Sequence, residues 1–297
     1  KPVIQTILAL IIISGLILIV RHAALPEGSN QYGYDYGFYS NAAKYTVNTV
    51  EYFIGQDNDY GNHLFSIMSW LRLPSSAGLE TSFILFSILA GWLIYFNLKK
   101  YSLFAATTGA LLFAFSIPQT LAASMFLWKN MYGQVLLLLI FYLLQNKKTF
   151  WELIPLSLLF ITHKTTSLIA IVATTGHYLF SQPNKHRWLL ITTLIGGLLA
   201  LLFLFNGYEY ILRLAQSSAS GGIFIKPTEY LTYNWFLFPL AVWGIYQSWK
   251  QKLEFPWLFM LAVCLVVWRC LVLPILTPQI LPTPCLCPTP LQVGASG

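Results

Sequence analysis

Charged residues are scarce in this chain. Asp, Glu, Lys and Arg make up 9% of its 297 residues, whereas 57% of the residues are hydrophobic. A water-soluble domain of this length would carry charge on roughly a quarter of its residues. The composition excludes an ordinary soluble domain and predicts an integral membrane protein.

Several common motifs are also missing. The chain has no phosphate-binding P-loop, no dinucleotide glycine fingerprint, no paired-histidine zinc motif and no Gly-x-Ser-x-Gly elbow. The four cysteines form no disulfide framework, because Cys264 and Cys270 lie in a hydrophobic run and Cys285 and Cys287 are too close for an easy mutual bridge. The net charge of +7 is scattered at the ends of hydrophobic runs, which argues against a nucleic-acid partner.

Hydrophobic runs dominate the chain. Aromatic residues, 16% of the total, suit the two membrane–water interfaces that such runs would cross. We expect an all-α fold of about nine transmembrane helices within residues 1–273, and a proline-rich tail, disordered or artefactual, at 274–297. The runs lie at about 3–20, 80–96, 102–117, 125–144, 150–162, 166–180, 188–205, 234–249 and 256–273.

The basic residues predict the orientation of these runs. When the runs are threaded alternately through a membrane, most lysine and arginine pairs fall on one side, which marks that side as cytoplasmic. The amino terminus is then cytoplasmic and the first long loop is outside. The residues on the basic side are Lys1, Lys99, Lys100, Lys147, Lys148, Lys185, Arg187, Lys250 and Lys252, against only Glu152 and Glu254.

The first long loop is patterned enough to form a helical cap at about 30–75. Phe38, Tyr45 and Tyr52 recur every seven residues, and a second amphipathic run covers 63–71. This pattern predicts two helices that lie in the membrane interface. The alternative is a small folded cap without function.

A single acid, Asp35, lies in a glycine- and tyrosine-rich segment at the start of this loop, between Tyr34 and Tyr36. A carboxylate held in aromatic surroundings just outside a membrane suits a proton-accepting group. The alternative is that Asp35 caps the helix that follows it.

Two later segments place polar groups at the predicted external side. Trp128-Lys129-Asn130 opens the fourth run, and Thr162-His163-Lys164-Thr165-Thr166 joins two short runs. Such a turn, ahead of a helix start with unpaired N–H groups, would cradle a phosphate. The alternatives are a polar turn capped by Thr165 or Thr166 and, for Lys129, a membrane-boundary anchor.

The remaining candidates are few. Arg213 is the one residue of the loop at about 206–233 placed to reach a phosphate, and that loop is either a mobile flap or a linker. We expect no resident cofactor. A divalent metal stays open, with Asp57, Asp59 and His63 as candidate ligands.

These features resemble the GT-C class of multispanning glycosyltransferases, whose donors are polyprenyl-phosphate sugars. The resemblance covers about residues 1–273 and rests on the cytoplasmic amino terminus, the acid in the first external loop, the interface helices and the later external bases. Trp128-Lys129-Asn130 and His163-Lys164-Thr165-Thr166 are similar to the Lys-Asn and His-basic-Thr-Thr positions of bacterial and archaeal membrane proteins grouped with that class.

The resemblance implies a multi-pass protein of a prokaryotic plasma membrane that transfers a sugar, with inversion, to an extracytoplasmic saccharide, lipid or protein. Asp35 is then the general base. Asp35 lacks the second acid that many members have, so a metal is not implied, and many members are longer, which predicts a truncated member. The alternative function is a lipid-linked saccharide or lipid-phosphate transporter or binding protein without catalysis. The implied substrate-binding residues are Tyr34, Tyr36, Lys129, Asn130, His163, Lys164, Thr165, Thr166 and Arg213.

Overall fold

The computed structural model describes residues 2–25, 36, 75–124, 126–146, 148, 151–181 and 184–204, and four single positions between 239 and 250. All regular structure in these residues is helical. The predicted cap apart from Tyr36, the eighth and ninth predicted runs apart from those four positions, and the tail at 274–297 lie outside the described residues. The helices are α1 (Pro2–Ala24), α5 (Ser75–Lys99), α6 (Leu103–Ala114), α7 (Ile117–Ser124), α8 (Trp128–Gln145), α9 (Leu153–Thr162), α10 (Lys164–Ser181) and α11 (Asn184–Leu204).

The first seven predicted hydrophobic runs each coincide with a helix, which confirms the all-helical prediction for this part of the chain. Helix α7 was not predicted as a separate element. Its signal is Pro118, in the first turn, where a missing N–H costs no hydrogen bond.

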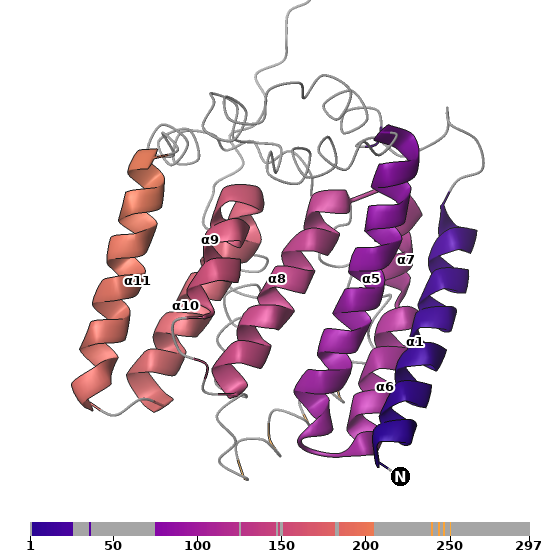
Figure 1. Ribbon diagram of the computed structural model, residues 1–297, viewed down its shortest axis with the longest axis horizontal. Coiled ribbons are helices and arrows are strands. Elements are labelled where there is room, and N and C mark those ends of the chain that lie inside the picture. Colours follow the sequence, from indigo (N-terminus) through magenta and orange to yellow (C-terminus); the bar gives the residue numbers. More distant parts are fainter. Residues whose placement is uncertain are drawn as a thin grey trace, which may run out of the picture.

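The helices lie side by side with their axes roughly aligned (Figure 1). We call the end where α1 begins the proximal end and the opposite end the distal end. Helix α5 lies centrally and packs against α1, α6 and α8, while α9, α10 and α11 extend the row beyond α8. Lys99, Lys100, Lys148 and Arg187 belong to connections or helix ends at the proximal end.

Small side chains allow α6 to pack closely on α1 and α5. Ala106, Ala110 and Ala114 recur every fourth residue, are fully buried, and pack in one cluster with Ile13 and Ile17 of α1. Residues at this spacing lie on one face of a helix. Such small-residue faces are typical of helix packing inside a membrane, where close backbone approach replaces the hydrophobic drive.

Hydrogen bonds between side chains and neighbouring helices reinforce this packing. A buried polar group is stable only when it is paired, so each bond also fixes the register of two helices. The bonds run from Trp92 Nε1 to Ser14 Oγ at 3.0 Å, from Asn97 Nδ2 to the Leu138 carbonyl at 3.1 Å, and from Trp128 Nε1 to Ser82 Oγ at 2.8 Å.

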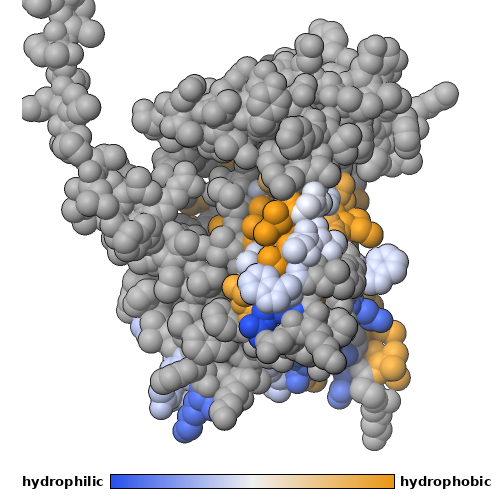
Figure 2. All heavy atoms as spheres, turned by 90° about the vertical axis from the view of Figure 1, so that its left-hand side faces the viewer, coloured by the Kyte–Doolittle hydropathy of each residue, from blue (hydrophilic) through white to orange (hydrophobic). Residues whose placement is uncertain are grey.

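Two described helices, over Val3–Ala24 and Gly78–Lys99, are long and apolar enough to cross a membrane. Helix α1 turns much of its apolar surface outward: Ile4 is 71% exposed and Ile11 is 62% exposed. Figure 2 faces the α11 side and shows apolar side chains over the middle of the described surface, with hydrophilic ones gathered toward its lower end. The count of nine spans stays a prediction.

Arg21 joins the distal end of α1 to the last turn of α6 and to α7. Its guanidinium is fully buried and donates from Nη2 to the Phe113 carbonyl at 3.1 Å and from Nη1 to Thr120 Oγ1 at 3.2 Å. It also lies 5.7 Å from the centroid of the Phe113 ring. The carbonyls in the last turn of α6 form the negative end of that helix, so the helix end takes the place of a carboxylate partner.

We expect Arg21→Ala to lower the free energy of unfolding by about 2 kcal/mol, because two charge-assisted hydrogen bonds are lost and relief of the buried charge offsets part of that loss. For a chain of this size the melting temperature should fall by about 4–8 °C in a thermal unfolding experiment in detergent. Arg21→Met, which fills the space without the charge, should lose less. An unchanged melting temperature for the alanine variant would show that the hydrogen bonds of Arg21 do not stabilise the packing of α1.

Candidate functional site

The site is built where α7 turns into α8. Helix α7 ends in a Schellman motif, with the Leu127 N–H bonded to the Ala122 carbonyl at 2.8 Å and the Phe126 N–H to the Ala123 carbonyl at 3.0 Å. The motif needs a left-handed residue, and Phe126 fills that position with φ of 55° where glycine is usual. This conformation costs about 1–2 kcal/mol for a residue with a side chain.

Burial of the Phe126 ring holds this turn in place. The ring is fully buried, with its centroid 5.4 Å from that of Phe83 and 5.0 Å from that of Tyr36. Full burial of such a side chain contributes about 1.5–3 kcal/mol, enough to offset the strained backbone. The turn therefore fixes where α8 begins, and with it the positions of Lys129 and Asn130 in the first turn of that helix.

His163 is the only residue between α9 and α10, so the predicted five-residue turn is shorter than expected. Its N–H bonds to the Leu159 carbonyl at 2.8 Å and its carbonyl accepts from the Ser167 N–H at 2.9 Å. The same residue thus ends α9 and caps the start of α10, and the predicted capping role of Thr165 or Thr166 is wrong. An extended backbone, with φ of −139° and ψ of 92°, makes the double role geometrically possible.

The ring of His163 links Thr166 to Asn130. The Thr166 backbone N–H lies 3.2 Å from Nδ1, and because a backbone N–H can only donate, Nδ1 must be the acceptor. The Thr166 hydroxyl, 2.7 Å away, donates to the same atom. The neutral ring therefore carries its proton on Nε2 and donates it to Asn130 Oδ1 at 2.6 Å. This leaves the amide NH₂ of the exposed Asn130 as a donor for a ligand.

Gly133 lets the two parts of the site approach. A Cβ atom at Gly133 would lie 3.3 Å from both Cβ and Cγ of His163. A side chain at position 133 would displace the His163 ring, so the ring packs directly against the backbone of α8. The His163 connection between α9 and α10 is thereby held against the start of α8.

Two helix starts with a lysine each meet at this junction. Lys129 lies in the first turn of α8 and Lys164 is the first residue of α10, and neither first turn contains an acid. A helix start is already electropositive, so a lysine there is unfavourable unless an anion lies nearby. Burial, followed by the charge of Lys129, lowers the pKa of His163 to about 4. The ring is therefore neutral at physiological pH.

This lowered pKa predicts a loss of stability in acid. The unfolded chain takes up a proton on His163 near pH 6.5 and the folded chain near pH 4, so stability is complete above pH 6.5 and falls as the pH drops toward 4. The shift corresponds to about 3 kcal/mol. His163→Asn keeps a capping oxygen and cannot titrate, so its melting temperature should fall less over this interval. Equal pH dependence in both proteins would contradict the assignment.

Tyr36, the residue after Asp35, lies at the same end of the bundle. Tyr36 is 6% exposed and packs edge to face on Phe126, three residues before Lys129. The other predicted site groups, namely Tyr34, Asp35, Asp57, Asp59, His63, Arg213 and the side chains of Lys164 and Thr165, lie outside the described residues. In the part of the chain that is described, no three His, Cys, Asp or Glu side chains are grouped to hold a metal ion.

Sequence reasoning missed two buried charged residues. Arg21 was not singled out, and Glu152 was counted as a loop acid, yet both are fully buried. Glu152 lies immediately before α9 and accepts a hydrogen bond from the Tyr178 hydroxyl of α10. The only signal in the sequence is a lone charge at the edge of a hydrophobic run, which membrane-boundary anchors share.

The chain was compared with family models, curated proteins and solved structures, and none of them matches it.

Proposed function

We propose that the chain is an inverting membrane glycosyltransferase that moves a sugar from a polyprenyl-phosphate donor to an extracytoplasmic acceptor. The observation that carries the proposal is the distal junction, where Lys129 and Asn130 start α8 and the His163 ring links Asn130 to Thr166. Tyr36 packs on Phe126, in the turn just before α8. An electropositive donor set at the same end of the bundle as Tyr36, the residue after Asp35, suits a displacement in which a phosphate leaves.

A membrane location is supported by the exposed face of α1. Transferring a half-exposed aliphatic side chain out of water contributes about 1 kcal/mol, so eight of them favour a lipid environment by roughly 8 kcal/mol, comparable with the whole stability of many domains. With the amino terminus in the cytoplasm, the proximal lysines face the cytoplasm and the distal junction faces outward. The eight residues are Val3, Ile4, Ile7, Leu8, Ile11, Ile12, Leu18 and Ile19, each at least 48% exposed.

The donor phosphate would be held by Lys129 and Asn130. Both ring nitrogens of His163 are engaged by Asn130 and Thr166, so the predicted substrate-binding role of His163 takes an indirect form: the ring orients the amide of Asn130. Lys129 supplies the charge and Asn130 the directed N–H. The starts of α8 and α10 add their dipoles to the same anion.

In the proposed reaction, the Asp35 carboxylate takes the proton of an acceptor hydroxyl as its oxygen attacks the anomeric carbon. The new C–O bond forms on the face opposite the bond to the phosphate oxygen, which breaks and leaves its electron pair on the polyprenyl phosphate. A phosphate monoester has a second pKa near 6, so this leaving group needs positive charge more than it needs a proton. Lys129 provides that charge where it develops.

Incubating the purified full-length chain in lipid with a panel of labelled polyprenyl-phosphate sugars tests the proposal. Transfer to an acceptor, or slow release of free sugar by water, would support an enzyme. Binding of the donor without either product would favour the alternative, a transporter or binding protein without catalysis.

A further inference from the structure

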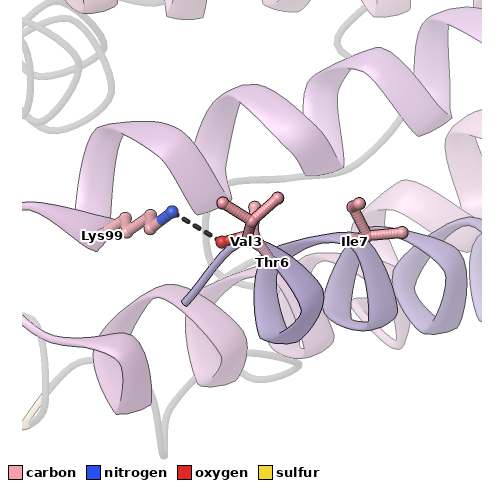
Figure 3. Close-up of a pocket in the computed structure, with 4 residues that line it drawn as sticks. All are labelled: Val3, Thr6, Ile7 and Lys99. Carbon is pink, nitrogen blue, oxygen red and sulfur yellow. Dashed lines mark hydrogen bonds between the residues drawn. The ribbon is translucent and has the colours of Figure 1, made fainter. Parts of the chain in front are cut away.

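A small groove lies between α1 and α5 at the proximal end, away from the proposed active site. Val3, Thr6 and Ile7 of α1 line it together with Lys99, the last residue of α5 (Figure 3). Thr6 and Ile7 lie three and four residues after Val3, so the three side chains share one face of the helix. The groove holds about 220 Å³, less than the roughly 300–1,000 Å³ of a typical substrate pocket.

The ammonium of Lys99 closes one side of this groove. Its Nζ donates to Thr6 Oγ1 at 2.7 Å and lies 5.8 Å from the centroid of the Tyr95 ring. A lysine ammonium has three N–H donors, and no acid among the described residues pairs with Lys99. Within the described part of the chain, two N–H donors of Lys99 are thus left beside the apolar wall of Val3 and Ile7.

We propose that this groove binds an anionic phospholipid of the membrane leaflet at the proximal end. One acyl chain would lie along Val3 and Ile7, which are 69% and 52% exposed, while the phosphate accepts hydrogen bonds from Lys99. Thr6 holds the lysine in position, so little side-chain freedom is lost on binding. Charge selects an anionic headgroup, and the apolar wall selects a lipid over a free phosphate, which gains nothing from Val3 or Ile7.

The inference rests on the membrane location and not on sugar transfer. It assigns the groove a lipid of the surrounding bilayer, whereas the proposed donor binds at the distal end. The proximal face is the predicted cytoplasmic one, where anionic lipids attract juxtamembrane lysines.

Native mass spectrometry of the full-length chain in a neutral detergent measures this binding directly. Phosphatidylglycerol should be retained about fivefold more tightly than phosphatidylcholine of the same chains, the effect expected of one lysine near an anionic headgroup. Lys99→Gln should remove that preference. Lys148→Gln, which changes another exposed proximal lysine, should keep it. Glycerol phosphate, which has the headgroup without the chains, should not compete.

Three results would each overturn the lipid site: equal retention of the two lipids, equal losses in the Lys99 and Lys148 variants, or full competition by glycerol phosphate. No sugar donor is present, so the outcome is independent of transfer. A chain that binds phosphatidylglycerol through Lys99 but turns over no donor would leave the lipid site standing and count against the transferase. Normal turnover with unchanged lipid binding in Lys99→Gln would do the reverse.

Discussion

Asp35→Asn is expected to lower the rate of sugar transfer by about 10²–10⁴-fold while donor binding stays nearly unchanged. A general base contributes about this much when it takes a proton from the attacking hydroxyl, and asparagine has the same shape but no basic oxygen. The loss should appear in kcat, because the proton moves only after the donor is bound. Radiolabelled donor in the transfer assay measures both quantities.

Glu51→Gln is the matched control, because it removes a carboxylate from the same predicted loop without touching the proposed base. It should retain transfer. If Asp35→Asn transfers sugar at the normal rate, Asp35 is not the base and the helix-capping interpretation gains support. If both variants lose transfer equally, the effect belongs to the loop's charge and not to one carboxylate.

Lys129→Gln is expected to weaken donor binding by about tenfold to a hundredfold. A hydrogen bond to a charged group contributes about 1.5–3 kcal/mol, and each 1.4 kcal/mol is a factor of ten in affinity. The loss of rate should be at least as large as the loss of affinity, because the phosphate gains negative charge as it leaves. Equilibrium binding of a labelled donor and single-turnover transfer separate the two effects.

Lys129→Arg should retain most of the affinity, since it keeps the charge at the start of α8, and Lys148→Gln should change nothing. Removing Lys129 also raises the pKa of His163, because one of the two causes that lower it disappears. A titration of the His163 ring by NMR would show this shift even in the absence of donor. Unaltered binding in Lys129→Gln would remove Lys129 from the phosphate site.

Seven of the eight helices were predictable because each contains a long, mainly apolar run, and such runs are recognised without knowledge of their neighbours. Helix α7 was not predicted because it is short and follows α6 after only two residues, 115–116. The position where α7 ends was not predicted for a different reason. The usual sequence signal for a Schellman turn is glycine. Here Phe126 takes the left-handed position because its ring is buried against Phe83 and Tyr36.

The site was predictable in its residues but not in its bonding. Asn130 and His163 were singled out from the sequence, and they are in contact although 33 residues separate them. The protonated nitrogen of His163, and hence the direction of the Asn130 amide, follows only from the position of the Thr166 N–H. Whether these groups bind a phosphate stays a prediction. The structural role of Arg21 could not be predicted because its hydrogen-bond partners lie 92 and 99 residues downstream.

That separation bears on how the chain is assembled. Arg21 is synthesised well before Phe113 and Thr120, and at about 5–20 residues per second the interval is roughly 5–20 seconds. Throughout it, a guanidinium at the end of the first inserted helix has neither of its final partners, and leaving it in hydrocarbon is costly. Helix α1 should therefore stay near the insertion machinery or the lipid surface until α6 and α7 emerge, and its docking would mark completion of the first half of the bundle.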